Sequence, residues 1–190
     1  MSLVVDHAKE YVEHIVAQLP GDGDFVPFIL TRRGTDEGFF GIAGIPDDNL
    51  AICDVMVAAT SITRAQEAVF GSPVWLAPGE QDGTLPENHP EREEVVMLLH
   101  CTGDGDAAHL ASIHRADGKV TLGPWQQGND THGPYAEALH LGMRLASKMT
   151  PEIAAAIQDG LETGDAGEMM RGALEALGNI RQQQAKSKEN

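Results

Sequence analysis

The feature that most constrains the fold is a segment in which nearly every side chain is apolar. Residues 95–102 read VVMLLHCT, and histidine and threonine are its two strongly polar side chains. A strand of this kind buries side chains on both of its faces, as the interior strands of sheets do. The remainder of the chain therefore has to supply packing layers for both sides of a sheet.

Three segments repeat apolar side chains at spacings of three and four, the pattern of an amphipathic helix. They cover residues 3–19, 50–69 and 134–149. Pro20 and Gly21 end the first segment, and Pro134 stands where the first turn of a helix favours proline. His140 lies off the apolar stripe of the third segment, so we expect it to be solvated.

The strand-like segments predict an antiparallel hairpin and a three-stranded meander. The hairpin joins residues 25–33 to residues 39–45, and the meander consists of residues 95–102, 107–115 and 119–125. Residues 71–90 are rich in proline and glycine, which predicts an irregular connection with a short extended piece at residues 73–76. Whether residues 71–94 form a functional lid is left open.

The resulting fold class is α+β, with one mainly antiparallel sheet of five strands and helices on both faces. The element order, helix, two strands, helix, three strands, helix, resembles that of the roadblock, longin and profilin-like folds. The resemblance implies that the intervening helix covers one face and the terminal helices cover the other. It rests on element order, and a shared fold says little about function.

The chain length fits one domain, since 190 residues can enclose a single core. Residues 1–150 are expected to form this α+β domain. Residues 151–182 are expected to form a helical extension of the same domain. The polar segment at residues 183–190 is expected to be a disordered tail.

The charge and the cysteines narrow the classes of partner. With 29 acidic and 13 basic residues the net charge is -16, which repels phosphate backbones and anionic lipids. Nucleic acid is therefore not expected as a partner, and no apolar window reaches the roughly 18 residues that cross a membrane. Cys53 and Cys101 fall in apolar patterns typical of reduced, buried thiols, which favours the cytoplasm.

Two histidines of the meander suggest a metal-binding or general-base site. If the turn after residue 102 pairs Thr102 with Ala107, His100 faces His109 across the ladder, near Asp104 and Asp106. Such a group could bind zinc or accept a proton. A register slip of one residue would place the histidines on opposite faces. The simpler reading is a pair of partly exposed histidines that hydrogen bond to loop carbonyls, and no third ligand follows from spacing.

A second candidate site is an anion site at Asp130 and His132, before the helix that begins at Pro134, where free N–H groups favour negative charge. A helix cap at Asp130 or Thr131 explains the same residues. No cofactor is strongly implied by any motif.

Apolar residues near the ends of the predicted elements suggest an interaction surface. Trp75 and Trp125 stand beside loops, where a tryptophan either anchors a partner or plugs the core. The C-terminal extension has helical apolar stripes that must be buried by its own sheet, by a partner or by a second copy. The candidate interface residues are Trp75, Met169, Met170, Leu174 and Leu177.

The leading hypothesis for function is therefore a non-catalytic cytoplasmic protein-interaction or adaptor domain that acts as a homo-oligomer. The alternative is a small-molecule or metal-dependent enzyme whose site lies near His100 and His109. The sequence identifies neither a substrate nor a partner, and it does not indicate a biological process.

Overall fold

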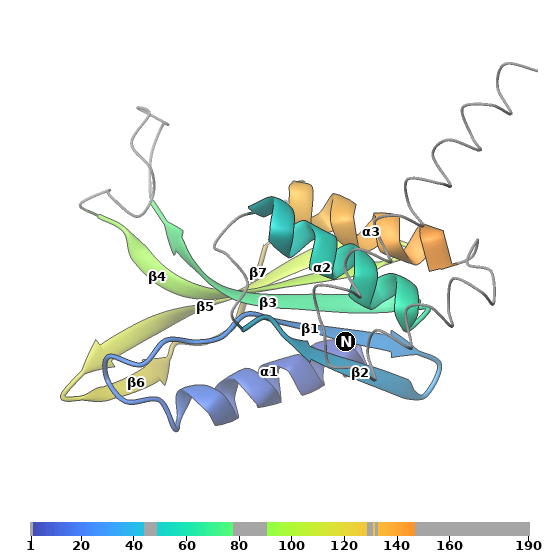
Figure 1. Ribbon diagram of the computed structural model, residues 1–190. Helices are drawn as coiled ribbons and strands as arrows, with labels where there is room; N and C mark the ends of the chain where they lie inside the picture. Colours follow the sequence, from blue (N-terminus) through green and yellow to red (C-terminus); the bar gives the residue numbers. More distant parts are fainter. Residues whose placement is uncertain (1, 44–48, 78–90, 129–130, 132, 147–190) are drawn as a thin grey trace, which may run out of the picture.

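The structure, a computed structural model, describes residues 2–43, 49–77, 91–128, 131 and 133–146. Within these residues the chain forms three helices and seven strands (Figure 1). In chain order they are α1 (Leu3–Val16), β1 (Phe28–Arg33), β2 (Asp36–Gly41), α2 (Asn49–Ile62), β3 (Glu67–Leu76), β4 (Glu93–Thr102), β5 (Asp106–Ala116), β6 (Lys119–Leu122), β7 (Gln126–Gly128) and α3 (Pro134–Ala146).

The strands form one antiparallel sheet in the order β2-β1-β3-β4-β5-β6, and β7 pairs with β5 beside β6. The expected mixed α+β class is confirmed. The expected count of five strands is not, because residues 67–76 form the strand β3, of which the sequence predicts only an extended piece at residues 73–76, and because β7 adds a further short strand. No helix among the described residues is long and apolar enough to cross a membrane.

The missing strand β3 results from a helix that stops earlier than its apolar pattern. The spacing of apolar residues predicts a helix to residue 69, but α2 ends at Ile62. Arg64 adopts a positive φ of 51°. The Ala65 N–H donates to the Thr60 carbonyl at 2.9 Å, and the Arg64 N–H donates to the Ser61 carbonyl at 3.1 Å. These two bonds are those of a Schellman motif, which ends the helix and frees the following residues to form β3.

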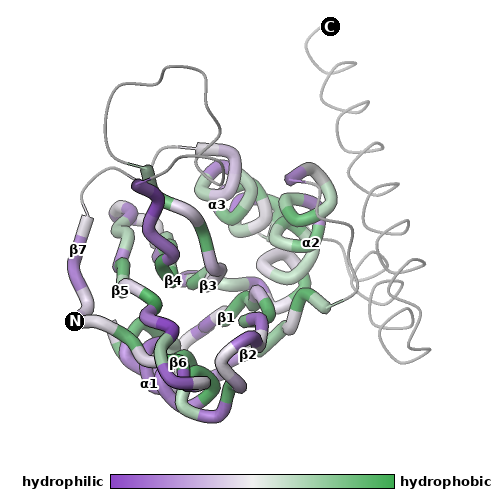
Figure 2. The backbone as a smooth tube through the Cα atoms, turned by 90° about the vertical axis from the view of Figure 1, so that its left-hand side faces the viewer, coloured by the Kyte–Doolittle hydropathy of each residue, from purple (hydrophilic) through white to green (hydrophobic). Residues whose placement is uncertain are grey.

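Two helical layers cover the sheet, one on each face (Figures 1 and 2). On one face α1 packs over a core that includes Val96 and Leu98 of β4. On the other face α2 and α3 pack over a core that includes Leu99 and Cys101 of β4. The two-sided burial expected from residues 95–102 is confirmed. The expected grouping of the terminal helices on one face is wrong, because α3 lies beside α2 and opposite α1.

Gly142 of α3 sets how closely α3 can approach α2. A Cβ at this position would overlap the Thr60 hydroxyl and would lie 2.6 Å from the Val57 carbonyl oxygen. The neighbouring Ser61 hydroxyl donates a hydrogen bond of 3.1 Å to the Gly142 carbonyl. The missing side chain therefore permits a direct contact between the two helices.

We predict that Gly142→Ala destabilises the protein by about 1–3 kcal/mol, because the added methyl group forces α2 and α3 apart. In a helix without such a contact, glycine to alanine stabilises by about 1 kcal/mol. The sign of the change in the free energy of unfolding therefore shows whether the close contact exists. Urea unfolding followed by circular dichroism measures the difference. Gly41→Ala is the matched control, since no heavy atom of the described residues other than its chain neighbours lies within 4 Å of its added Cβ. A more stable Gly142→Ala variant would contradict the close contact.

Candidate functional site

The β4–β5 ladder decides which of the predicted site residues meet. The structure pairs Cys101 with Asp106, His100 with Ala107 and Leu98 with His109. The register that would place His100 opposite His109 is not formed, because the observed pairing is displaced from it by two residues. A shift of two residues in the register leaves each side chain on the same face of the sheet. Both histidines therefore lie on the α1 face, but they are not opposite each other in the ladder.

His100 takes part in a polar network at the start of α1. Its Nε2 lies 2.8 Å from Oε1 of Glu67 on β3. The same Glu67 oxygen accepts a hydrogen bond from the Ser2 hydroxyl, and its other oxygen lies 3.9 Å from the Arg32 guanidinium. The network joins the beginning of α1 to β1, β3 and β4, which gives His100 a structural role.

His109 is a buried histidine with 6% of its surface exposed. Burial lowers its pKa, and electrostatic repulsion from Lys9 and the neighbouring His100 lowers it further, while Asp6 acts in the opposite direction. The neutral imidazole is therefore favoured. Neither His109 nor His100 belongs to a group of three potential metal ligands within the described part of the chain.

The two aspartates predicted to accompany these histidines lie apart from them. Asp104 is exposed in the turn between β4 and β5, where its N–H donates to the Thr102 hydroxyl at 3.1 Å. Asp106 faces α3, because it pairs with Cys101, which belongs to the core on that side of the sheet. The four predicted residues are thus divided between the two faces and the turn.

On the α3 face, Asp106 meets two residues that sequence reasoning did not select. Its Oδ1 lies 2.8 Å from Nε2 of His140 on α3. One ligand atom each from Cys101, Asp106 and His140 all lie within 4.8 Å of one another. Cys101 is fully buried, whereas the side chains of Asp106 and His140 are 17% and 28% exposed. The group of Cys101, Asp106 and His140 therefore has one fully buried member and two members that solvent can reach.

Burial is the main cause that raises the pKa of the Cys101 thiol, and the negative charge of Asp106 adds to the effect. Without a bound cation the sulfur is therefore protonated and a poor nucleophile. The signal that could have identified this group is the register, since only a shift of two residues pairs Cys101 with Asp106.

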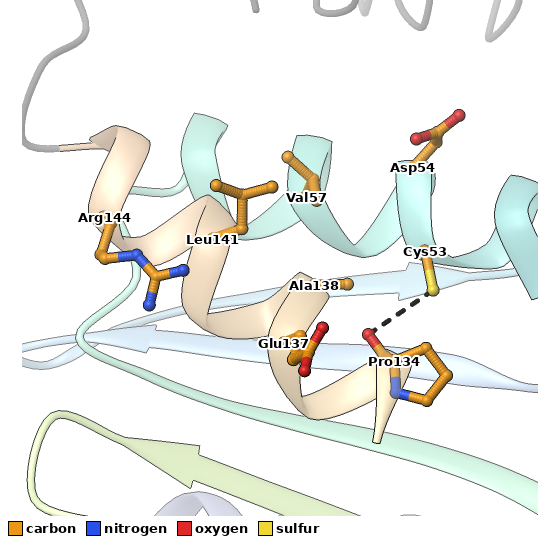
Figure 3. A pocket seen from close by; sticks show the side chains of 8 residues that line it. All are labelled: Cys53, Asp54, Val57, Pro134, Glu137, Ala138, Leu141 and Arg144. Carbon is orange, nitrogen blue, oxygen red and sulfur yellow. Dashed lines mark hydrogen bonds between the residues drawn. The ribbon is translucent and has the colours of Figure 1, made fainter. Parts of the chain in front are cut away.

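A groove of about 520 Å³ runs between α2 and α3 (Figure 3). Val57, Ala138 and Leu141 give it an apolar floor. Its remaining lining residues are Cys53, Asp54, Pro134, Glu137 and Arg144. The pKa of the Cys53 thiol is raised mainly by burial and also by Asp54 and Glu137. The thiol points at the Pro134 carbonyl oxygen, 3.7 Å away. Such a groove suits apolar side chains better than nucleophilic chemistry.

The two tryptophans have different surroundings. Trp75 is 39% exposed near the end of β3, and the Arg92 guanidinium lies 4.7 Å from its ring centroid. Trp125 packs against the core under α1, and its Nε1–H donates to the Glu13 carboxylate at 3.0 Å. The other predicted anion-site and interface residues, Asp130, His132, Met169, Met170, Leu174 and Leu177, lie outside the described residues.

Comparisons with known proteins add no functional assignment. Neither a protein-family model, nor a curated protein, nor a solved structure matches the chain. The geometry of the described residues is therefore the basis for inferring function.

The lowered pKa of His109 predicts a loss of stability in mild acid. The unfolded chain binds a proton near pH 6.5 and the folded chain resists it, so stability falls as the pH drops below about 6.5. One such group contributes a slope of at most about 1.4 kcal/mol per pH unit. We expect His109→Gln to have a shallower slope between pH 7.5 and 5.

Urea unfolding at a series of pH values measures this slope for the wild-type chain and the His109→Gln variant. His14→Gln is the control, since His14 is exposed on α1. It should keep the wild-type slope. Equal slopes for the wild-type chain and His109→Gln would show that burial does not affect protonation of this histidine.

Proposed function

We propose that this protein is a non-catalytic protein-interaction domain that works as a homo-oligomer, with its C-terminal segment forming the contact between copies. The main support is a mismatch of length. The α2–α3 groove is lined by α3 residues between Pro134 and Arg144, about 15 Å of helix at 1.5 Å per residue. The apolar stripes that follow α3 run over residues 153–180, about 40 Å if they are helical.

The groove can therefore accept the first of these stripes but not both. Ile153, Ile157 and Leu161 follow the end of α3 at Ala146 closely enough to fold back over the groove, since a helical hairpin needs a loop of only about 2–5 residues. Another surface then has to bury the second stripe, which consists of Met169, Met170, Leu174 and Leu177. A second copy of the chain provides one, because two identical stripes are self-complementary.

The reactive groups of the described residues support a non-catalytic role. His100 is held by Glu67, and His109 lies buried under α1. The pKa values of both cysteine thiols are raised, so neither is an activated nucleophile. Cys101 does lie close to Asp106 and His140, but burial and the Asp106 carboxylate keep its thiol protonated, which argues against a role as a nucleophile.

We expect the full-length chain to be a dimer or larger in light scattering, and the chain truncated after Met149 to be a monomer. The double variant Leu174→Glu, Leu177→Glu should also be a monomer, because four carboxylates would meet at the contact between two copies. Far-ultraviolet circular dichroism checks that the domain stays folded in each case.

The matched control is Gln182→Glu, Gln183→Glu, which adds the same charge just beyond the stripe and should leave the oligomer intact. A full-length chain that is monomeric at all concentrations overturns the proposal. So does an oligomer that survives both the truncation and the double substitution.

A further inference from the structure

We propose that Cys101, Asp106 and His140 form a binding site for a divalent transition metal, and that zinc is the ion their chemistry fits best. The site is independent of self-association, because it lies between the sheet and α3 and uses none of the residues of the C-terminal segment. It is also distinct from the site predicted around His100 and His109, with which it shares only Asp106.

Three elements of the fold converge on this site. Cys101 near the end of β4 and Asp106 at the start of β5 are paired residues of one ladder, so their side chains lie next to each other on the same face. α3 crosses that face, and the buried Leu139 anchors the helix in the core beside them. His140 follows Leu139 and reaches the Asp106 carboxylate, so the three ligand atoms approach one another within 4.8 Å.

The donor set matches what zinc uses in proteins. Zinc binds thiolate sulfur at about 2.3 Å and imidazole nitrogen or carboxylate oxygen at about 2.0–2.2 Å, commonly with three protein ligands and water as the fourth. Hard cations such as magnesium and calcium prefer oxygen ligands, so a thiol and an imidazole disfavour them. Tetrahedral bonds of this length require ligand atoms roughly 3.5 Å apart. The Asp106 and His140 ligand atoms lie 2.8 Å apart, and no pair of the three ligand atoms is more than 4.8 Å apart, so the separations are compatible with a shared ion after side-chain adjustment.

Exposure of the site allows an ion to enter and water to complete its coordination. The side chains of Asp106 and His140 are 17% and 28% exposed, so solvent reaches both, whereas Cys101 is fully buried. In the metal-free chain the Cys101 sulfur carries a proton in its S–H bond and lies close to the Asp106 carboxylate. On binding, the sulfur–metal bond replaces this S–H bond and the proton passes to solvent. A bound ion would then join β4, β5 and α3 through one centre.

The test uses the purified full-length chain, stripped with a chelator and titrated with zinc alone against a chromophoric competitor. We expect one zinc ion per chain. Cys101→Ala and His140→Gln should each lower the affinity by at least about 100-fold, since each removes one of three ligands. Cys53→Ala and His14→Gln remove a thiol and an imidazole from elsewhere and should bind as the wild-type chain does. Zinc should also raise the Tm of the wild-type chain, but not that of Cys101→Ala.

Cobalt(II) gives a second readout, because a thiolate ligand produces a charge-transfer band that oxygen and nitrogen ligands do not. The band should be present in the Cys53→Ala variant and absent from Cys101→Ala. If Cys101→Ala does not fold, His140→Gln decides the matter through zinc affinity, since its side chain is partly exposed. Zinc below one equivalent per chain, or wild-type affinity in His140→Gln or a folded Cys101→Ala variant, overturns the proposal.

Discussion

The burial of β4 on both faces is the constraint on which the rest of the molecule depends. Val96 and Leu98 require a layer on one side, and Leu99 and Cys101 require a layer on the other. Burying a side chain of this size is worth about 1.5–3 kcal/mol, so neither layer can be omitted from a marginally stable domain. α1 supplies the first layer, and α2 and α3 together supply the second. Because α2 and α3 share a face, they also form the groove between them.

The same alternation sorts the reactive side chains. Even-numbered residues near the end of β4 point to α1, and one of them, His100, contacts Glu67 on that face. His109 of β5 lies opposite Leu98, so it is on the same face and is buried there. The odd-numbered Cys101 points to α3 with its partner Asp106, and His140 completes that group. One ladder therefore separates a structural polar network from a set of convergent metal-type ligands. The burial that raises the pKa of Cys101 disfavours its thiolate until a cation is present to stabilise it.

The sequence was sufficient for the α+β class, the antiparallel hairpins and the two-sided burial, since these follow from local periodicity and turn residues. It failed at β3, because Ala65 and Val69 continue the apolar spacing of α2 after a Schellman motif has already ended the helix. It also failed for the register after Thr102, because a turn displaced by one residue toward the N-terminus, which pairs Cys101 with Asp106, fits the same sequence. The sequence predicts a solvated His140, because its partner Asp106 becomes a neighbour only when α3 packs on the sheet. Both the register and that placement are tertiary effects that periodicity does not encode.

The atoms that coordinate a bound zinc ion test most directly whether Cys101, Asp106 and His140 on the α3 face form a metal site. X-ray absorption at the zinc edge, recorded on the full-length Cys53→Ser variant, leaves Cys101 as the single source of a thiolate ligand. The structure predicts one sulfur at about 2.3 Å together with nitrogen and oxygen ligands at about 2.0–2.2 Å. A coordination shell made up of nitrogen and oxygen alone would contradict it.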